Sequence, residues 1–376
     1  MGNIHVRHSR ASKIPLSTKG NKRFKSIFGI AFLLVLSINF IWMASSTTAT
    51  MLSLKNVFKE DELVNKSTKI RQKIKRIAFL KIPKTGSSTF SCIFVRFGIN
   101  HNLTVFLARN NFISDIQQKL LVEHGQHFDI FATHTIYNYY FFTQIVPDPA
   151  IIGSVREPGQ RVISHAFFQH KYRTLRRHME LSAQRFIDEI VLNTSMYGLQ
   201  NYMSSYFGIS NSEIDSRLSQ KIIKTLNSEF LIVLILERIH ESLILLKRLL
   251  NWSFADIIYA KKRTTDHQQV FLNKSQTEHI RSTNKLEYEI YDYFSNELTR
   301  KIKKQGNDFK GEVGHFKHIL NETRVFCENA STYEKIHIFP QSKWDASFSI
   351  SLEDCNMIFK MDMRTFKAGN TFIRFT

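Results

Sequence analysis

The chain has 376 residues, of which 43% are hydrophobic, so it can build one large α/β domain with appendages, and this composition excludes wholesale disorder. Its formal net charge of +20 at pH 7 calls for an anionic partner, such as nucleic acid, a membrane surface or a phosphorylated or sulfated small molecule. No zinc-ligand spacing or RNA-binding aromatic motif accompanies the dispersed Lys and Arg residues, so we expect no nucleic-acid partner.

The first predicted element is a basic tail followed by an apolar membrane span. Residues 1–26 carry seven Lys and Arg residues and no acidic residue, and residues 27–44 contain no charge. At about 1.5 Å of rise per residue, these 18 residues just cross a thin bilayer as a helix. The positive-inside rule then predicts a type II signal-anchor with a cytosolic tail and a lumenal body. A cleaved signal peptide is the alternative, although such peptides have a shorter basic lead and a shorter apolar core.

The predicted stem, residues 45–75, is polar and charged, and seven N-x-S/T sequons follow the apolar segment. These candidate glycosylation sites give modest support to a lumenal body. Asn102 and Asn251 sit beside apolar runs that we expect to be buried, so we expect several of the sequons to be unused. The seven sequons are at Asn65, Asn102, Asn193, Asn251, Asn273, Asn321 and Asn329.

Short apolar runs alternate with helical patterns along the body, residues 76–330. The runs predicted to be buried strands are 76–80, 130–133, 150–155, 230–236 and 254–259. The segments predicted to be helices are 87–97, 158 to about 171, and 239–250. Strands that alternate with helices predict an α/β fold, in which helices cover both faces of a parallel sheet.

The turn after the first predicted strand has the composition of an anion-binding loop. Gly86 precedes a helix start, where unpaired backbone N–H groups and the positive end of the helix dipole attract an anion. Lys84 adds a point charge, and Ser87, Ser88 and Thr89 add hydroxyl donors. The Walker A pattern is absent, because the lysine precedes the glycine instead of following it. Taken alone, the motif also fits an ordinary helix start beside incidental lysines.

A second strand–turn–helix, IIGSVREPGQRVISHAFF, strengthens the interpretation as an anion site. Arg156 ends the strand, and Ser164 lies about two turns into the helix that Pro158 opens. An arginine can hold a phosphate through two hydrogen bonds while a helix hydroxyl donates another. Two anion-binding elements in one sheet predict a ligand with two separated anionic groups.

At these residues the chain resembles the galactose-3-O-sulfotransferases. KIPKTGSST is similar to the loop that holds the 5′-phosphosulfate of 3′-phosphoadenosine 5′-phosphosulfate (PAPS), and Arg156 with Ser164 matches the spacing of the 3′-phosphate motif. FLKIPKTGSSTF, HTIYNYY and FLIVLILERIHESLILLKRLLNWSFADIIY extend the resemblance over about residues 76–330. It implies a P-loop-like sulfotransferase fold, PAPS as donor co-substrate, no metal, and a single-pass type II protein of the Golgi membrane.

The resemblance also implies roles for the loop residues. Lys84 would stabilise the charge on the bridging oxygen as it leaves the sulfur. Arg156 and Ser164 would hold the 3′-phosphate. The residues implied to hold the 5′-phosphosulfate are Lys84, Thr85, Gly86, Ser87, Ser88 and Thr89.

Sulfuryl transfer also needs a base for the acceptor hydroxyl, as phosphoryl transfer does. His134 is our candidate, because it follows a predicted strand and an imidazole can accept a proton near neutral pH. His165 and His101 are weaker candidates. Aromatic side chains that could stack on a sugar are Tyr137, Tyr139 and Tyr140, although three aromatics so close together more often belong to a half-buried turn.

The implied reaction is transfer to the 3-hydroxyl of a terminal β-galactoside on a glycolipid or a glycoprotein. A glycosaminoglycan O-sulfotransferase, acting on a uronic acid or hexosamine, is the alternative, and the net positive charge would suit it. A Golgi glycosyltransferase is disfavoured because the chain contains no D-x-D pair. A non-catalytic lectin is disfavoured by the presence of Lys84, Arg156 and His134. Acceptor specificity could lie in 172–192 or in the tail, and the sequence leaves the oligomeric state open.

The chain contains three cysteines, too few for a disulfide scaffold. In an oxidising lumen Cys327 and Cys355 could pair and leave Cys92 buried in an apolar helix, and three reduced thiols are the alternative. Residues 331–376 show no clear periodicity, so this C-terminal extension has no predicted role.

Overall fold

We describe the protein from a computed structural model, in which Met1–Arg71 and Gln72–Thr376 form two units. The predicted tail, the signal-anchor and the stem up to residue 71 lie outside the described residues. Among the helices that are described, none is long and apolar enough to cross a membrane. The described residues are 72–108, 112–172, 182–192, 198–209, 216–262, 270–329, 335–361 and 373–375.

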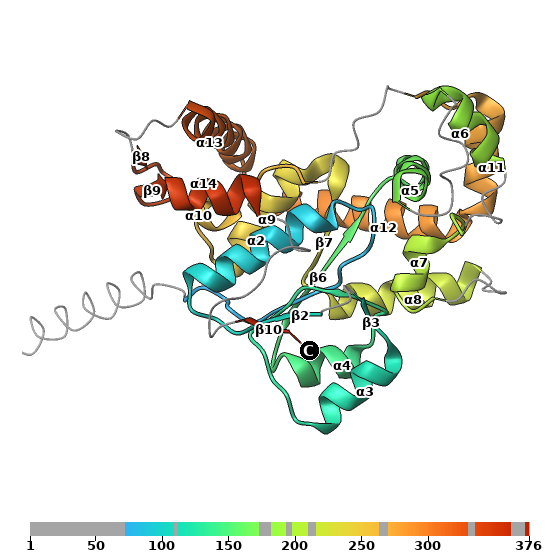
Figure 1. Ribbon diagram of the computed structural model, residues 1–376, viewed down its shortest axis with the longest axis horizontal. Coiled ribbons are helices and arrows are strands. Elements are labelled where there is room, and N and C mark those ends of the chain that lie inside the picture. The colour runs from blue at the N-terminus through green and yellow to red at the C-terminus, as the bar shows by residue number, and fades with distance from the viewer. Residues whose placement is uncertain are drawn as a thin grey trace, which may run out of the picture. The chain divides into compact units, whose positions relative to one another are not determined.

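A parallel sheet forms the centre of the second unit (Figure 1). Its strands are β1 (Ile77–Phe79), β2 (Val105–Leu107), β4 (Ile130–Phe131), β6 (Ala150–Val155), β7 (Ile232–Ile235) and β10 (Ile373–Phe375). The strand order is β10-β2-β4-β1-β6-β7, and every neighbouring pair is parallel. β1 therefore lies between β4 and β6, with Ile77 opposite both Ile130 and Ala150. The predicted parallel sheet is confirmed.

Helices cover both faces of this sheet, as predicted. In Figure 1, α2 (Ser87–Asn100) lies above the strands and α4 (Tyr139–Ile145) lies below them. The helix predicted from Pro158 is α5 (Pro158–Tyr172), and the helix predicted over 239–250 is α9 (Ile239–Leu250). Fully buried phenylalanines join α2 to the sheet, because the ring centroid of Phe79 lies 6.2 Å from Phe90 and 5.0 Å from Phe94.

The remaining described elements are mostly helices. A second, two-stranded sheet pairs β3 (Phe112–Ile113) with β5 (His134–Thr135) in parallel. Apart from a short helix at 254–257, the other described helices before residue 304 are α3 (Asp115–Glu123), α6 (Ala183–Val191), α7 (Tyr202–Tyr206), α8 (Ser216–Glu229), the 3-10 turn η2 (Leu236–Arg238), α11 (Lys274–Thr283) and α12 (Lys285–Lys303).

The strand predicted over 254–259 is wrong. This segment begins as a short helix, α10 (Phe254–Ile257). The reason is local, since Ser253 and Asp256 form a capping box in which each side chain accepts from the other residue's backbone N–H. The apolar residues of the segment are buried as expected, but helical capping overrides their strand propensity.

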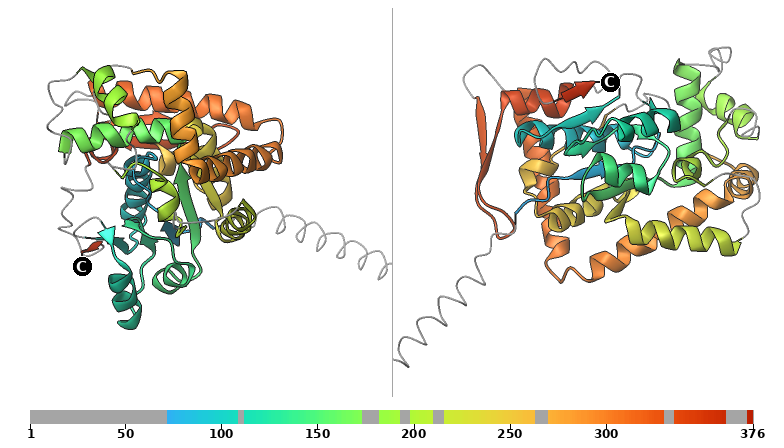
Figure 2. Two further views of the ribbon diagram at one scale, coloured as in Figure 1. Left: turned by 90° about the vertical axis from the view of Figure 1, so that its right-hand side faces the viewer. Right: turned by 90° about the horizontal axis from the view of Figure 1, so that it is seen from below.

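The C-terminal segment extends the main sheet. After α13 (Phe309–Asn329), the chain forms an antiparallel hairpin of β8 (Ile336–Phe339) and β9 (Phe348–Ser351), which stands apart from the main sheet in Figure 2. The short helix α14 (Leu352–Cys355) and the π-helical turn η3 (Asn356–Lys360) follow, and β10 then pairs with β2. A disulfide joins Cys327 of α13 to Cys355 of α14, and Cys92 lies buried in α2.

Asn102 and Asn251 are exposed, although the apolar runs beside them are buried as expected. Each follows the end of a buried helix and turns the chain with positive φ, 53° at Asn102 and 54° at Asn251. Asparagine tolerates this left-handed conformation better than most residues do. The apolar runs beside these asparagines are buried, but the turns themselves are not.

A buried ion pair fixes α5 to α12. The Arg161 guanidinium and the Glu287 carboxylate are both fully buried, and Arg161 Nε lies 2.9 Å from Glu287 Oε2. Glu287 also accepts from the backbone N–H of Met203 in α7. The carboxylate of Glu287 in α12 thus connects this helix to both α5 and α7.

We predict that Glu287→Ala lowers the free energy of unfolding by about 3–5 kcal/mol, because it leaves a buried guanidinium without its counter-ion. Urea titration measures the loss. The control is Glu328→Ala, which removes an exposed pair with Arg324 and is expected to change stability by less than about 1 kcal/mol. Equal effects of the two variants would contradict the importance of the buried pair.

Candidate functional site

The predicted site residues come from the carboxyl ends of three neighbouring strands. β1 leads into the loop 80–86, β4 leads to His134, and β6 leads to Arg156. Because these strands are parallel and β1 lies in the middle, their ends meet at one edge of the sheet. Open α/β sheets bind ligands at this edge.

The loop after β1 has an unusual backbone. Lys84 and Gly86 have positive φ angles of 67° and 76°, a region that residues with a side chain rarely adopt. A Cβ atom on Gly86 would lie only 2.5 Å from Leu236 Cδ1. Gly86 immediately precedes α2, whose start has no side-chain cap hydrogen bond. The first N–H groups of α2 therefore form the kind of helix terminus that binds anions.

The hydroxyl groups of the loop have different partners. Thr85 is fully buried, and its hydroxyl lies 2.7 Å from Ser154 Oγ of β6 and donates to Ile82 O at 2.9 Å. This hydroxyl fastens the loop to the sheet, so Thr85 could bind a ligand only through its backbone. Thr89 is buried and accepts from the Lys262 backbone N–H at 3.1 Å. Ser88 is the half-buried hydroxyl of the group.

Arg156 lies directly beside the loop. Its Nη1 donates to the Lys84 carbonyl oxygen at 3.3 Å, and its Nε is 4.0 Å from Glu237 Oε1. Burial lowers the pKa of the Arg156 guanidinium from its ordinary value, while Glu237 and Glu157 act in the opposite direction. The contact joins the two predicted anion-binding elements.

α5 brings a second residue of the predicted 3′-phosphate motif to this edge. The Lys84 ammonium lies 4.7 Å from the centre of the Phe168 ring. Phe168 follows Ser164 by four residues, so the two share one face of the helix. Ser164 is half-buried. The structure therefore brings Lys84, Arg156 and the Ser164 face of α5 together.

His134 lies on the other side of the loop. Its Nδ1 is 2.6 Å from the Lys81 carbonyl oxygen. Because a carbonyl can only accept, this hydrogen bond requires a proton on Nδ1, which leaves a lone pair on Nε2 of the neutral ring. The tautomer is the one that a general base acting through Nε2 needs.

The weaker histidine candidates are placed differently. His165 is buried in α5, where its ring lies 4.4 Å from that of Tyr202. His101 follows α2 and pairs with Asp256, with 3.1 Å between Nε2 and Oδ1. Since α2 has 14 residues, His101 lies about 20 Å along the helix from the loop, so the structure does not bring it to the candidate site.

The predicted tyrosines also separate. Tyr139 and Tyr140 are exposed at the start of α4. The Tyr137 hydroxyl donates to Glu229 Oε2 at 2.8 Å, which draws this side chain toward α8. Four further residues reach this edge through contacts between residues distant in sequence, which leave no local pattern: Phe112, Phe168, Glu237 and Lys262.

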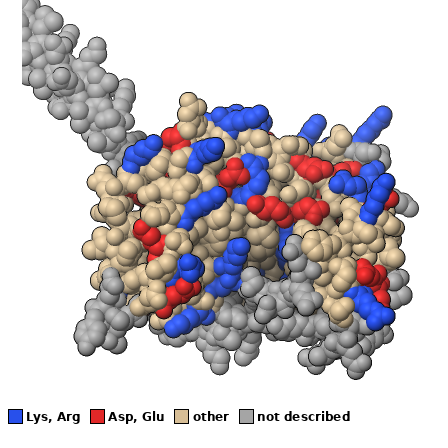
Figure 3. Space-filling view, turned by 90° about the horizontal axis from the view of Figure 1, so that it is seen from above, with Lys and Arg blue, Asp and Glu red and all other residues tan. Residues whose placement is uncertain are grey.

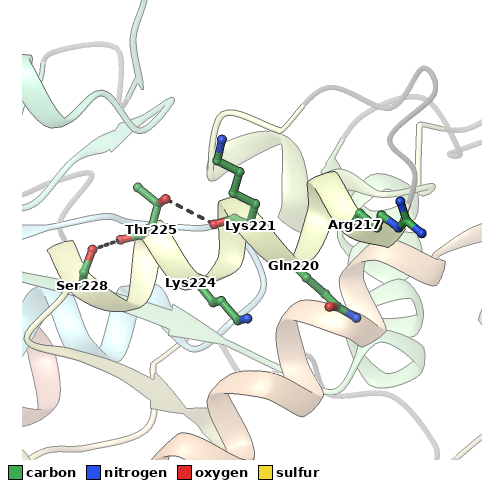
Figure 4. A pocket seen from close by; sticks show the side chains of 6 residues that line it. All are labelled: Arg217, Gln220, Lys221, Lys224, Thr225 and Ser228. Carbon is green, nitrogen blue, oxygen red and sulfur yellow. Dashed lines mark hydrogen bonds between the residues drawn. The ribbon is translucent and has the colours of Figure 1, made fainter.

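The surface hollow on α8 lies outside this site. It measures about 430 Å³, and Lys221 and Lys224 point away from each other there (Figure 4). On the face that Figure 3 shows, Lys and Arg are interspersed with Asp and Glu. Within the described ranges, no group of three or more His, Cys, Asp or Glu side chains is arranged to hold a metal ion. The lining of the α8 hollow is Arg217, Gln220, Lys221, Lys224, Thr225 and Ser228.

The fold and the edge geometry define an α/β protein in which Lys84, Arg156 and His134 lie around one loop at the edge of a parallel sheet. Residues 19–338 match the galactose-3-O-sulfotransferase family, so the chain belongs to this family and is a sulfotransferase. Galactosylceramide sulfotransferase of Homo sapiens is 27% identical over 307 residues, which cover 76% of this chain and 72% of that protein. Galactose-3-O-sulfotransferase 2 of Mus musculus is 24% identical over 243 residues, which cover 59% of this chain and 61% of that protein.

The loop geometry predicts that Gly86→Ala destabilises the protein more than Gly198→Ala. Both positions have positive φ, but a Cβ at Gly198 would meet no atom within 4 Å. Gly198→Ala is expected to cost about 1–2 kcal/mol of unfolding free energy, and Gly86→Ala should exceed this because Leu236 must move. Chemical denaturation of both variants measures the difference, and equal losses would mean that the loop has room for a side chain.

Proposed function

We propose that the protein transfers a sulfuryl group from PAPS to the 3-hydroxyl of a terminal β-galactoside, using a P-loop-like sulfotransferase fold. The observation that carries this proposal is the contact between Arg156 and Lys84, which joins two anion-binding elements at one sheet edge. A donor with a 5′-phosphosulfate and a separate 3′-phosphate needs two such elements. The cation and hydroxyl content of the edge suits this donor.

The residues divide between the two ends of the donor. Arg156 and Ser164 bind the 3′-phosphate. Lys84 binds the phosphosulfate and stabilises the bridging oxygen when its bond to sulfur breaks. The Lys84 ammonium lies 4.7 Å from the centre of the Phe168 ring, and this cation–π contact holds it beside the loop. The loop residues that hold the 5′-phosphosulfate are Thr85, through its backbone, Gly86, Ser87, Ser88 and Thr89.

His134 accepts the proton of the galactose 3-hydroxyl through Nε2. The hydroxyl oxygen forms the new bond to sulfur, the bond from sulfur to the bridging oxygen breaks, and adenosine 3′,5′-bisphosphate leaves with that electron pair. The hydrogen bond to the Lys81 carbonyl fixes the ring beside the loop. It also stabilises the imidazolium that forms, because Nδ1 keeps its proton throughout.

The surroundings of His134 favour a glycolipid as the acceptor. Phe112 lies opposite His134 in the β3–β5 pair, and Ile136 directly follows β5. Both side chains are exposed. An apolar aglycone could pack against these two side chains and be shielded from water. A glycosaminoglycan would instead need a continuous basic surface around His134, whereas the two exposed side chains named here are apolar.

We place the catalytic unit in the Golgi lumen, behind a signal-anchor at 27–44 and a stem at 45–75. The disulfide between Cys327 and Cys355 supports this location, since disulfides persist in oxidising compartments. The catalytic domain at 76–330 and the extension at 331–376 are part of the same proposal.

The full-length protein in detergent, incubated with labelled PAPS and a panel of acceptors, tests the function. We expect 3-O-sulfation of a galactolipid, weaker transfer to soluble β-galactosides and none to glycosaminoglycans. Linkage analysis of the product identifies the sulfated position. Transfer to a uronic acid or hexosamine with no reaction at galactose would overturn the acceptor assignment.

Arg156→Ala should weaken the binding of PAPS and of adenosine 3′,5′-bisphosphate together by about 1.5–3 kcal/mol, the loss of one charge-assisted contact. Binding of adenosine 5′-phosphosulfate, which lacks the 3′-phosphate, should change little. Calorimetric titration measures all three, with the exposed Arg300→Ala as the control variant. An equal loss for all three nucleotides would remove Arg156 from this role.

His134→Ala should lower turnover by a factor of about 10²–10⁴ and leave PAPS binding and the melting temperature nearly unchanged. Wild-type activity should fall at acidic pH, because a protonated imidazole cannot accept a proton. Lys84→Ala should differ by weakening both donor binding and turnover. Full turnover in a folded His134→Ala protein would redirect the search to His165.

A further inference from the structure

The carboxyl end of α9 carries an exposed sequon. Asn251 caps this helix in the left-handed conformation, with φ 54° and ψ 41°, and is exposed. The next sequon residue, Trp252, is buried, and its Nε1–H donates to Ile74 O at 2.9 Å. Ser253, the third, donates to Asp256 Oδ2 at 2.7 Å. The turn is therefore fixed on its far side while Asn251 stays at the surface.

A surface hollow of about 340 Å³ lies beside Asn251. The half-buried Trp344, which precedes the β9 strand, lines one side of the hollow. Its ring also contacts the Lys343 ammonium, at 4.4 Å from the ring centre, and the His315 ring, at 5.3 Å between centroids. Polar side chains from the start of the unit and from α9 complete it. The residues lining the hollow include Lys73, Arg248, Asn251, Ser253, Trp344 and Asp345.

The charges around this hollow are already paired within the protein. Lys73 Nζ lies 2.6 Å from Asp256 Oδ2, and Arg248 lies 2.6 Å from Glu312 and 2.9 Å from Asp308. Hydrogen bonds from Lys73 and Ser253 keep the pKa of Asp256 below its ordinary value although burial alone would raise it. An anionic ligand would therefore compete with internal carboxylates, whereas a neutral ligand with hydroxyl and amide groups would not.

The hollow lies away from the candidate active site. α9 follows β7 and runs back along the sheet, so its end lies near the amino ends of the strands. Ile74, three residues before β1, donates its backbone N–H to Leu250 O at 2.9 Å, which fixes this placement. A group attached here would leave the edge with Lys84 and His134 open.

We propose that Asn251 carries an N-linked glycan whose first N-acetylglucosamine occupies the hollow beside Trp344. This sugar is neutral, begins at the asparagine amide, and presents an apolar ring face together with hydroxyl and acetamide groups. The inference rests on the lumenal location proposed above, because N-glycans are added only to segments that enter the lumen of the secretory pathway. Occupancy of the hollow links the turn after α9 to the segment around Trp344, so the glycan stabilises the fold.

The full-length protein, expressed in a eukaryotic secretory system, tests the inference. Glycopeptide mass spectrometry should find Asn251 occupied. Asn251→Gln should remove one glycan. Because glutamine fits the left-handed turn at this position less well than asparagine does, the effect of the sugar is measured by enzymatic removal of glycans, which should lower the melting temperature of the wild type by roughly 2–4 °C and that of Asn251→Gln by less. Asn329→Gln, an exposed sequon at the end of α13, is the matched control and should show the same decrease as the wild type.

A second variant separates occupancy from the contact. In Trp344→Ala, Asn251 should remain glycosylated, but enzymatic removal of glycans should change the melting temperature less than it does in the wild type. If glycans are found at other sequons but not at Asn251, this inference is overturned and the lumenal location is not. Occupancy without any stabilisation would overturn the sugar's place in the hollow. Absence of glycans from every sequon would overturn the lumenal location, and the inference with it.

Discussion

The candidate site depends on the parallel pairing of β1 between β4 and β6. This pairing holds the loop 80–86 from both sides. On the β6 side, Thr85 contacts Ser154 at 2.7 Å and Arg156 donates to the Lys84 carbonyl at 3.3 Å. On the β4 side, His134 lies 2.6 Å from the Lys81 carbonyl. A change of register in either strand would move a proposed catalytic or binding group away from the loop.

The same contacts connect binding to chemistry. Backbone carbonyls of the loop accept hydrogen bonds from Arg156 and His134. The loop that we propose to bind the 5′-phosphosulfate therefore also orients the residue proposed for the 3′-phosphate and the residue proposed for the acceptor hydroxyl. The positive φ at Lys84 and Gly86 is the conformational cost of this arrangement. The buried pair of Arg161 and Glu287 then keeps α5 against the body, and α5 carries Ser164 and Phe168.

Much of this could be predicted because the signals are local. The apolar runs at β1, β6 and β7, the helical spacing of α2 and α9, and the glycine before α2 are all read within a few residues. The errors arose where another local interaction prevailed, as when Ser253 and Asp256 capped a helix where a strand was expected. Contacts between distant residues, such as Lys262 with Thr89 or β10 with β2, leave no local pattern and needed the structure.

The central claim is that one nucleotide spans the loop and Arg156. A structure of the full-length protein with adenosine 3′,5′-bisphosphate measures this most directly. The account predicts the 5′-phosphate at the N–H groups that begin α2, and the 3′-phosphate within hydrogen-bond distance of Arg156 and Ser164. A nucleotide bound in the reverse orientation, or away from this edge of the sheet, would contradict it.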